Sequence, residues 1–156
     1  MIADLSHEVV IRPALKKDAP AVAQLIKPYV AERMLLPRTL KDLRRLTTNG
    51  FVAEAQGRVV GFAAVDIYSK KLSELVCLAV AADCQHRGIG KRLVHACVER
   101  ARAKKVLELM AITAAEHFFK ACGFDYSLPG QKKALFADPK RMAIEHPDDV
   151  EPENRT

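Results

Sequence analysis

The stretch Leu75-Val-Cys-Leu-Ala-Val80, followed after a short loop by Gln85-His-Arg-Gly-Ile-Gly90, decides the fold of this chain. The apolar run predicts a buried strand, and the two glycines open a basic amphipathic helix predicted over residues 88–104. The first amides of a helix have no intrahelical acceptor, and the helix dipole adds positive potential at the same place. Glycine lets the backbone approach a phosphate without a Cβ in the way. The stretch therefore predicts a strand, an anion-binding turn and a helix, and a pyrophosphate is the ligand that fits this turn.

Basic side chains around the turn favour a phosphorylated ligand, whereas two other phosphate-binding patterns fit poorly. Arg87, Lys91 and Arg92 add positive charge. The pattern GxxxxGK followed by Ser or Thr is absent, and GxGxxG would need a third glycine where Leu93 stands. A Gly-x-Gly pair at a helix start is also compatible with a purely structural role, so the pair alone does not assign a function.

Apolar periodicity on either side of this stretch predicts a mixture of strands and helices. Strands are predicted at residues 8–12, 51–55, 59–67, 72–81 and 106–112, with further extended pieces at 124–126 and 134–145. Helices are predicted after the N-caps Asp18 and Thr39, over 88–104, and over 114–122 with Gly123 as the stop. A Gln56-Gly57 turn joins the second and third strands. The order β-α-α-β-β-β-α-β-α-β-β is that of an α/β chain with a mixed sheet whose first half is antiparallel.

Length and composition indicate one globular domain. The chain has 156 residues, of which 28% are charged, and we expect one domain over residues 1–145. Residues 146–156 are acidic and nearly free of aliphatic side chains, so we expect a disordered tail. No apolar run approaches the roughly 20 residues that span a bilayer, and the N-terminus lacks the pattern of a signal peptide. We therefore expect a cytoplasmic protein without membrane contact.

The charge is unevenly distributed along the chain. The formal net charge is +6, but residues 145–156 carry five acids and one Arg, which leaves 24 bases and 14 acids, or +10, in residues 1–144. A basic body suits a polyanion, either nucleic acid or a phosphorylated cofactor. No recognition helix or aromatic RNA-binding signature accompanies the charge, so nucleic-acid binding is the weaker interpretation.

The four cysteines form no CxxC pair and no zinc-like spacing with histidine, so no metal site is predicted. We expect reduced thiols that pack in the core. Cys77 invites an acyl-enzyme interpretation, but its neighbours are apolar and no His near it in sequence would activate it. We therefore expect Cys77 to pack within its strand.

The sequence Gln-x-x-Gly-x-Gly after an apolar strand resembles motif A of the GNAT acetyltransferases. Phe118-Phe-Lys-Ala-Cys-Gly-Phe124 is similar to the helix that precedes the sixth strand of that family, and the element order also matches. The resemblance implies the GNAT acyl-CoA N-acyltransferase fold and acetyl-CoA as co-substrate. Backbone groups at these positions would bind it: Cys77, Leu78 and Val80 of the strand, and Gln85, Arg87, Gly88, Ile89, Gly90 and Lys91 of the loop.

Five further segments resemble the acetyltransferase domain of the N-acetylglutamate synthase family, which begins arginine biosynthesis. They are Arg12-Pro-Ala14, Leu36-Pro-Arg-Thr39, Glu74-Leu-Val-Cys-Leu-Ala-Val80, His117-Phe-Phe119 and Leu128-Pro-Gly-Gln-Lys-Lys133. The long members of that family also carry a kinase-like domain, so the resemblance implies a short, stand-alone form. It implies transfer of an acetyl group to the α-amine of an amino acid, L-glutamate first, by direct attack.

The same resemblance assigns roles to individual side chains. Arg38 would bind a substrate carboxylate through two parallel hydrogen bonds from its guanidinium. Glu74 would accept the proton of the α-ammonium, directly or through water, and His117 would assist deprotonation or orient the substrate. Lys70 or Lys71 would bind the glutamate side chain, and Lys140 or Arg141 would keep the positive charge of a glutamate-binding Arg in the family.

Two departures from the family pattern leave alternatives open. Phe119 stands where many GNAT enzymes have a Tyr that protonates the leaving thiolate, so the general acid is unassigned. Met142 stands where the synthase family has a substrate-binding Ser, which also opens related acceptors such as glutamine. The alternatives are acetylation of a polyamine, an antibiotic or a protein N-terminus, and a non-catalytic acetyl-CoA-binding module. The sequence leaves open whether the chain forms a homodimer.

Overall fold

The computed structural model describes residues 8–127 and 129–140. Its contacts divide the chain into two compact units, Met1–Phe124 and Asp125–Thr156. All of the helices and strands described below belong to the first unit. The predicted boundary between residues 145 and 146 lies outside the described residues, as does Arg141.

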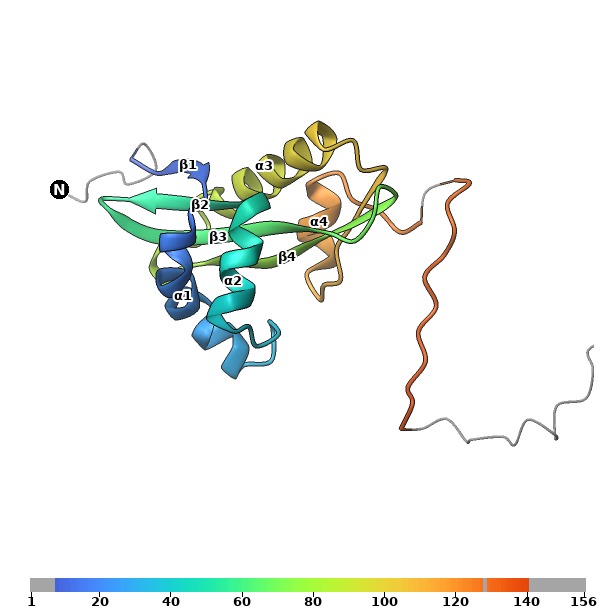
Figure 1. Cartoon of the computed structure of the whole chain (residues 1–156), viewed down its shortest axis with the longest axis horizontal. Helices are drawn as coiled ribbons and strands as arrows, with labels where there is room; N and C mark the ends of the chain where they lie inside the picture. The colour runs from blue at the N-terminus through green and yellow to red at the C-terminus, as the bar shows by residue number, and fades with distance from the viewer. Residues whose placement is uncertain (1–7, 128, 141–156) are drawn as a thin grey trace, which may run out of the picture. The chain divides into compact units, whose positions relative to one another are not determined.

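One mixed sheet forms the centre of the first unit (Figure 1). Its strands follow chain order: β1 (Val10–Pro13), β2 (Gly50–Ala55), β3 (Arg58–Ile67), β4 (Leu72–Val80) and β5 (Glu108–Met110). The first four are antiparallel to their neighbours, and β5 runs parallel to β4. The five strands lie close to their predicted positions, which confirms the mixed α/β class.

Helices cover both faces of the sheet (Figure 1). They are α1 (Ala19–Ala31), α2 (Leu40–Leu46), α3 (Ile89–Ala103) and α4 (Glu116–Ala121). Val22, Leu43 and Phe62 belong to the core cluster of α1 and α2, whereas Leu93 and Val94 belong to that of α3. Residues 60–66 of β3 are all buried, as expected of a strand covered on both faces.

Local signals fix several element boundaries as predicted. Thr39 caps α2: its Oγ1 accepts from the Asp42 amide at 3.1 Å, and the Asp42 carboxylate accepts from the Thr39 amide at 3.3 Å. Gln56 and Gly57 both have positive φ values, 51° and 73°, which suit a tight hairpin between β2 and β3. Gly123 follows α4 with φ 94° and ends it as predicted.

Asp18 precedes α1 as predicted, but its side chain does not cap the helix. Its two carboxylate oxygens accept from the Arg12 guanidinium at 2.9 Å each, and one also accepts from the Leu15 amide at 2.7 Å. Arg12 holds the pKa of Asp18 below its usual value, against the opposing effect of burial and with help from Leu15. The acid therefore ties β1 to the start of α1.

We expect Asp18→Asn to lower the free energy of unfolding at pH 7 by about 2–3 kcal/mol, because Arg12 would lose its ionised partner. Because the pKa of Asp18 is lower in the folded than in the unfolded protein, its ion pair stabilises the fold fully at pH values above the unfolded-state pKa of about 3.9. That stabilisation is lost as the pH falls through the folded-state pKa. Urea unfolding at pH 7 and at pH 3 should show a smaller difference from wild type at the lower pH. Asp83→Asn is the control, since its pair with Arg58 is exposed and should contribute little.

The last two predicted strands are absent from the described residues. Residues 124–126 and 134–140 form no strand, and residues 141–145 are not described. Leu135 and Phe136 are 92% and 79% exposed. The apolar run Ala134-Leu-Phe-Ala137 suits an extended segment, but such a run becomes a strand only where a neighbouring strand supplies hydrogen bonds. None of the helices in the described part of the chain is long and apolar enough to cross a membrane.

Candidate active site

The sheet opens between β4 and β5. The two strands pair only at Leu72↔Glu108, Ser73↔Leu109 and Glu74↔Met110. Beyond Glu74, residues 75–80 of β4 have no strand partner on that side within the described structure. An open edge of β4 therefore extends from Glu74 to the loop that precedes α3.

A bulge lies in the middle of this open edge. Phe62 pairs with Ala79 and Ala64 pairs with Val76, so both Cys77 and Leu78 stand opposite Ala63. Cys77 has φ 58°, a conformation that costs a non-glycine residue about 1–2 kcal/mol. Such a bulge redirects backbone groups at a strand edge. Burial raises the pKa of the Cys77 thiol, which is 6% exposed and therefore suited to packing.

The turn at the start of α3 has the geometry of an anion site. Gly88 is the N-cap with φ 77°, and a Cβ built there would meet no atom within 4 Å. The Arg92 amide donates to the Gly88 carbonyl at 3.1 Å, so the amides of residues 89–91 precede the first intrahelical bond. The turn therefore has backbone donors without intrahelical partners next to open space at Gly88.

Gln85 anchors this turn to the end of β4. Its Nε2 donates to the Tyr29 hydroxyl at 2.6 Å and to the Val80 carbonyl at 3.3 Å. The Tyr29 hydroxyl also donates to the Val80 carbonyl. Gln85 thus supports the loop through its side chain, and the Val80 carbonyl is already occupied by these two donors.

The remaining residues predicted for the loop divide into packing and exposed groups. The Ile89 side chain is buried in the core, and a Cβ on Gly90 would lie 3.4 Å from the Phe118 ring. Arg87 and Lys91 are exposed. Arg92 differs from expectation, because its guanidinium donates to the Val9 carbonyl at 3.0 Å. A diphosphate group fits the open turn, its amides and the two exposed cationic side chains.

A second group of side chains gathers on the α1–α2 side of β4. Arg38, from the loop between the helices, lies close enough to the Cys77 thiol and the Tyr68 hydroxyl to oppose the rise of their pKa values. Arg38 Nε is the one buried side-chain nitrogen or oxygen without a hydrogen-bond partner of good geometry across residues 8–127 and 129–140, although the guanidinium also lies within weak hydrogen-bonding reach of the Cys77 thiol. A buried, unpaired guanidinium nitrogen is costly, so this donor is suited to an anionic ligand.

Glu74 and Arg38 both influence the pKa values of the Tyr68 hydroxyl and the Cys77 thiol, so these two charged groups share the same surroundings. Tyr68 donates its hydroxyl to Glu74 Oε2. Asp66 stands directly opposite Glu74 in the β3–β4 pair, and the Arg45 guanidinium binds both Asp66 oxygens, at 2.8 and 3.3 Å. We call Arg38, Arg45, Asp66, Tyr68 and Glu74 the acceptor cluster.

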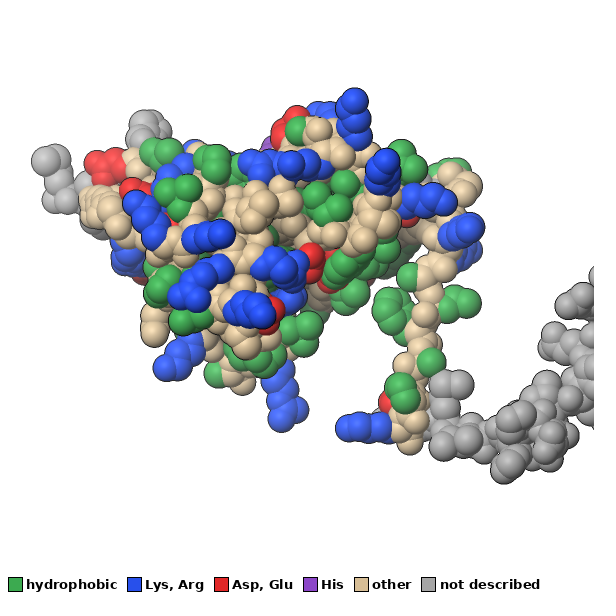
Figure 2. Space-filling view, in the orientation of Figure 1, with side chains coloured by type: hydrophobic (Ala, Val, Ile, Leu, Met, Phe, Trp, Pro, Cys, Tyr) green, Lys and Arg blue, Asp and Glu red, His purple; other side chains and the backbone are tan. Residues whose placement is uncertain are grey.

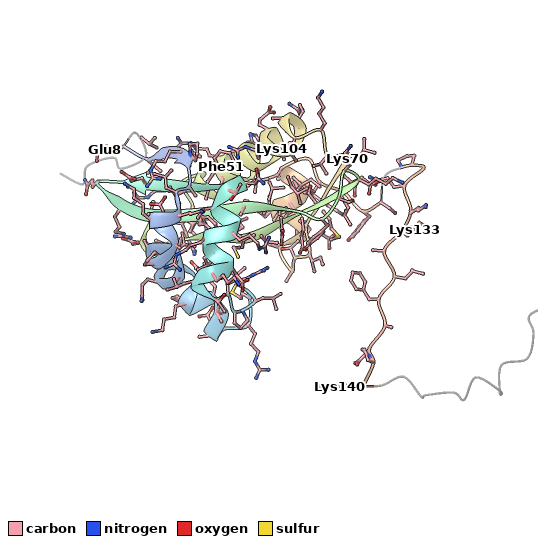
Figure 3. The ribbon with its side chains drawn as sticks, in the orientation of Figure 1. Glu8, Phe51, Lys70, Lys104, Lys133 and Lys140 are labelled. Atoms are coloured by element: carbon pink, nitrogen blue, oxygen red, sulfur yellow. The ribbon has the colours of Figure 1, made fainter. Side chains whose placement is uncertain are left out.

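The other predicted side chains belong to other segments of the chain. His117 is exposed in the first turn of α4, and no described contact joins it to Glu74. Lys70, labelled in Figure 3, and its neighbour Lys71 are exposed in the β3–β4 turn. Their carbonyls accept from the amides of Leu107 and Glu108. Lys140 belongs to the second unit and is exposed. The structure therefore brings together Arg38 and Glu74 of the predicted acceptor residues.

Sequence reasoning missed four residues of these sites. Tyr29, Tyr68 and Arg45 carry no sequence signal for their contacts. Asp66 offered a clue, since an acid inside an apolar strand needs a partner. That partner, Arg45, lies on a different element and could not be inferred from spacing.

Lys and Arg side chains gather over α1 and α2 on the face shown in Figure 2. The exposed bases of these two helices are Lys27, Lys41, Arg44 and Arg45. In contrast, no group of three or more His, Cys, Asp or Glu side chains suited to a metal ion occurs in the part of the chain that the structure describes. The surface beside the acceptor cluster therefore favours anions.

Comparison with known proteins defines the class to which this fold and site belong. Residues 18–124 match the model of the acetyltransferase (GNAT) family. The chain therefore belongs to the GNAT acetyltransferase family.

Within that family, the similar proteins include amino-acid acetyltransferases. One, from Ralstonia nicotianae, is 34% identical over 140 residues, which cover 86% of this chain and 31% of that protein. The chain thus spans about a third of the length of this relative. An uncharacterized N-acetyltransferase of Chlorobaculum tepidum is 31% identical over 73% of this chain and 74% of its own length.

Two solved structures are similar in fold and sequence. Rv2747 from Mycobacterium tuberculosis, in complex with CoA and NLQ, has a TM-score of 0.71 at 30% identity and covers 76% of this chain and 73% of its own. N-acetylglutamate synthase from Neisseria gonorrhoeae, complexed with coenzyme A and N-acetyl-glutamate, has a TM-score of 0.66 at 30% identity. That match covers 72% of this chain and 27% of the synthase.

Proposed function

We propose that this protein transfers the acetyl group of acetyl-CoA to the α-amine of an amino acid, with L-glutamate as the first acceptor and arginine biosynthesis as the pathway. The observation that carries the proposal is the end of β4–β5 pairing at Glu74. The edge that opens there leads from a carboxylate to the helix start at Gly88. A thioester bound along this edge would lie between a base and an anion site.

The donor half of the reaction uses backbone groups. The turn at Gly88 and the amides of residues 89–91 would bind the diphosphate of acetyl-CoA, with Arg87 and Lys91 adding charge. Backbone groups at the Cys77–Leu78 bulge would orient the acetyl group. The CoA-bound relatives at 30% identity support this assignment.

The acceptor half uses the acceptor cluster. Arg38 binds the α-carboxylate of the amino acid through its unpaired Nε side. Glu74 accepts a proton from the α-ammonium, which frees the nitrogen lone pair for attack. A carbon–nitrogen bond to the acetyl carbon forms, the carbon–sulfur bond to CoA breaks, and the nitrogen loses its second proton while the thiolate takes one up and leaves as the CoA thiol. The basic surface over α1 and α2 favours an anionic acceptor over a polyamine.

A thiol-release assay with a panel of acceptors tests the function. Glutamate, glutamine, spermidine and a peptide with a free N-terminus should be compared at equal concentrations with acetyl-CoA. We expect release with glutamate and little with spermidine. Release with the peptide or spermidine alone would reject the amino-acid assignment, and binding of acetyl-CoA without release to any amine would indicate a binding module.

The donor site is tested by Gly88→Ala, with Gly57→Ala as a matched control. Both glycines have positive φ, 77° and 73°, and open space around a Cβ, so both variants should lose about 1 kcal/mol of folding stability. Only Gly88→Ala should weaken acetyl-CoA binding, by about tenfold, because its methyl group would occupy the anion turn. Calorimetric titration with acetyl-CoA measures this, and equal affinities in the two variants would contradict the site.

A further inference from the structure

Tyr68 forms a contact that the proposed reaction does not yet use. It is the first residue after β3, and its hydroxyl donates to Glu74 Oε2. One carboxylate oxygen of the proposed base is therefore already bound before an acceptor arrives. The Tyr68 side chain is 54% exposed and therefore contributes little to the core. Its described contact with Glu74 is made through the hydroxyl.

The backbone beneath Tyr68 fixes its position relative to Glu74. The amides of Tyr68 and Ser69 both donate to the Leu72 carbonyl at 3.1 Å. Ser69 Oγ in turn accepts from the amides of Lys71 and Leu72, at 3.1 and 3.2 Å. The turn is closed by four hydrogen bonds, so the phenol approaches Glu74 from a supported loop.

The charges around Glu74 explain why the partner is a phenol. Asp66 stands opposite Glu74 on β3, and like charges at such positions repel each other. Arg45, from α2, is bound to Asp66, while Arg38, from the α1–α2 loop, keeps its Nε unpaired. A cation bound to a carboxylate weakens its affinity for protons, whereas a neutral donor orients it at smaller cost to basicity.

The hydroxyl remains a donor over the working pH range. The pKa of Tyr68 is raised to about 12, chiefly by its hydrogen bond to Glu74, with burial and the charges of Glu74 and Asp66 adding to the effect and Arg38 opposing it. The proton therefore stays on the phenol at neutral pH. The contact is that of a phenol donating to an ionised carboxylate.

We propose that Tyr68 is the positioning residue of Glu74: it holds one carboxylate oxygen so that the other faces the acceptor amine. This inference rests on the proposed function, because Glu74 is the base of that reaction. Tyr68 itself exchanges no proton with the substrate. It acts by limiting the rotation of Glu74.

Tyr68→Phe tests the proposal, since it removes the hydroxyl and keeps the ring. We expect kcat/KM for the acceptor to fall about tenfold, with the affinity for acetyl-CoA unchanged. In a Glu74→Gln background the same substitution should have no further effect on kcat/KM.

Three outcomes distinguish this inference from the proposed function. Thiol release by Tyr68→Phe at the wild-type rate overturns the positioning role, as does an equal loss in the Glu74→Gln background. No thiol release by the wild-type protein with any amino acid overturns the proposed function itself.

The pairing is also measurable without turnover. Difference absorbance between wild type and Tyr68→Phe isolates Tyr68 ionisation. At about pH 11 this phenol should be mostly protonated in wild type and mostly ionised in Glu74→Gln, since the ordinary tyrosine pKa is about 10. The same ionisation in both proteins would overturn the pairing.

Discussion

Replacing Glu74 by Gln should lower kcat about 10²–10³-fold, the largest effect expected of any single substitution in this protein. General-base catalysis contributes factors of this size, and an amide cannot take the proton from an ammonium group. The substitution keeps the shape of the side chain and its place as the last β4 residue paired with β5. Acetyl-CoA affinity should therefore stay within about twofold of wild type, since its proposed contacts lie on residues 77–91.

Steady-state thiol release at saturating acetyl-CoA and acceptor measures this effect. Glu99→Gln is the matched control, because Glu99 is an exposed acid on α3 whose ion pair with Arg102 lies on the helix surface. It should leave kcat unchanged. A Glu74→Gln enzyme that retained more than a tenth of the wild-type kcat would exclude Glu74 as the base.

Replacing Arg38 by Ala should raise the KM for the amino-acid acceptor about 10- to 100-fold. A hydrogen bond to a charged group contributes about 1.5–3 kcal/mol, which corresponds to this range. Arg38 is suited to this role because its Nε is buried and unpaired in the described structure. Its loss should leave acetyl-CoA binding intact and lower kcat less than it raises KM.

Arg38→Lys and Arg44→Ala complete the test. Lysine keeps the positive charge but loses the planar fork, so most of the acceptor affinity should still be lost. Arg44 is an exposed base on α2, and its removal should change the KM less than twofold. Similar KM values for Arg38→Ala and Arg44→Ala would show that surface charge, rather than a defined carboxylate contact, governs the acceptor.

Features determined by neighbouring residues could be predicted from the sequence. The strand before Gln85, the glycine turn and the helix after it lie as predicted, because periodicity and helix-start chemistry are local. The Thr39 cap and the Gln56-Gly57 hairpin belong to the same group. Arg38 and Glu74 were also named from the sequence, through resemblance rather than spacing.

Features that depend on distant partners could not be predicted. Asp18 had the position of a helix cap, but Arg12 binds its carboxylate. Likewise, an extended piece was predicted at residues 134–145, but its described part, residues 134–140, pairs with no neighbouring strand in the described structure. In both cases the local sequence is compatible with two structures, and contacts with distant residues decide which of the two forms.

The two halves of the proposed reaction come from separate parts of the chain. Every residue of the acceptor cluster lies between Arg38 and Glu74, and every donor contact lies between Cys77 and Lys91. The loop bearing Arg38 joins two helices on one side of the sheet, while α3 packs against the other side. Under the proposed function, substitutions in that loop would change which amine is accepted without altering the binding of acetyl-CoA. This arrangement would let related enzymes diverge in acceptor specificity while keeping the same acetyl-CoA site.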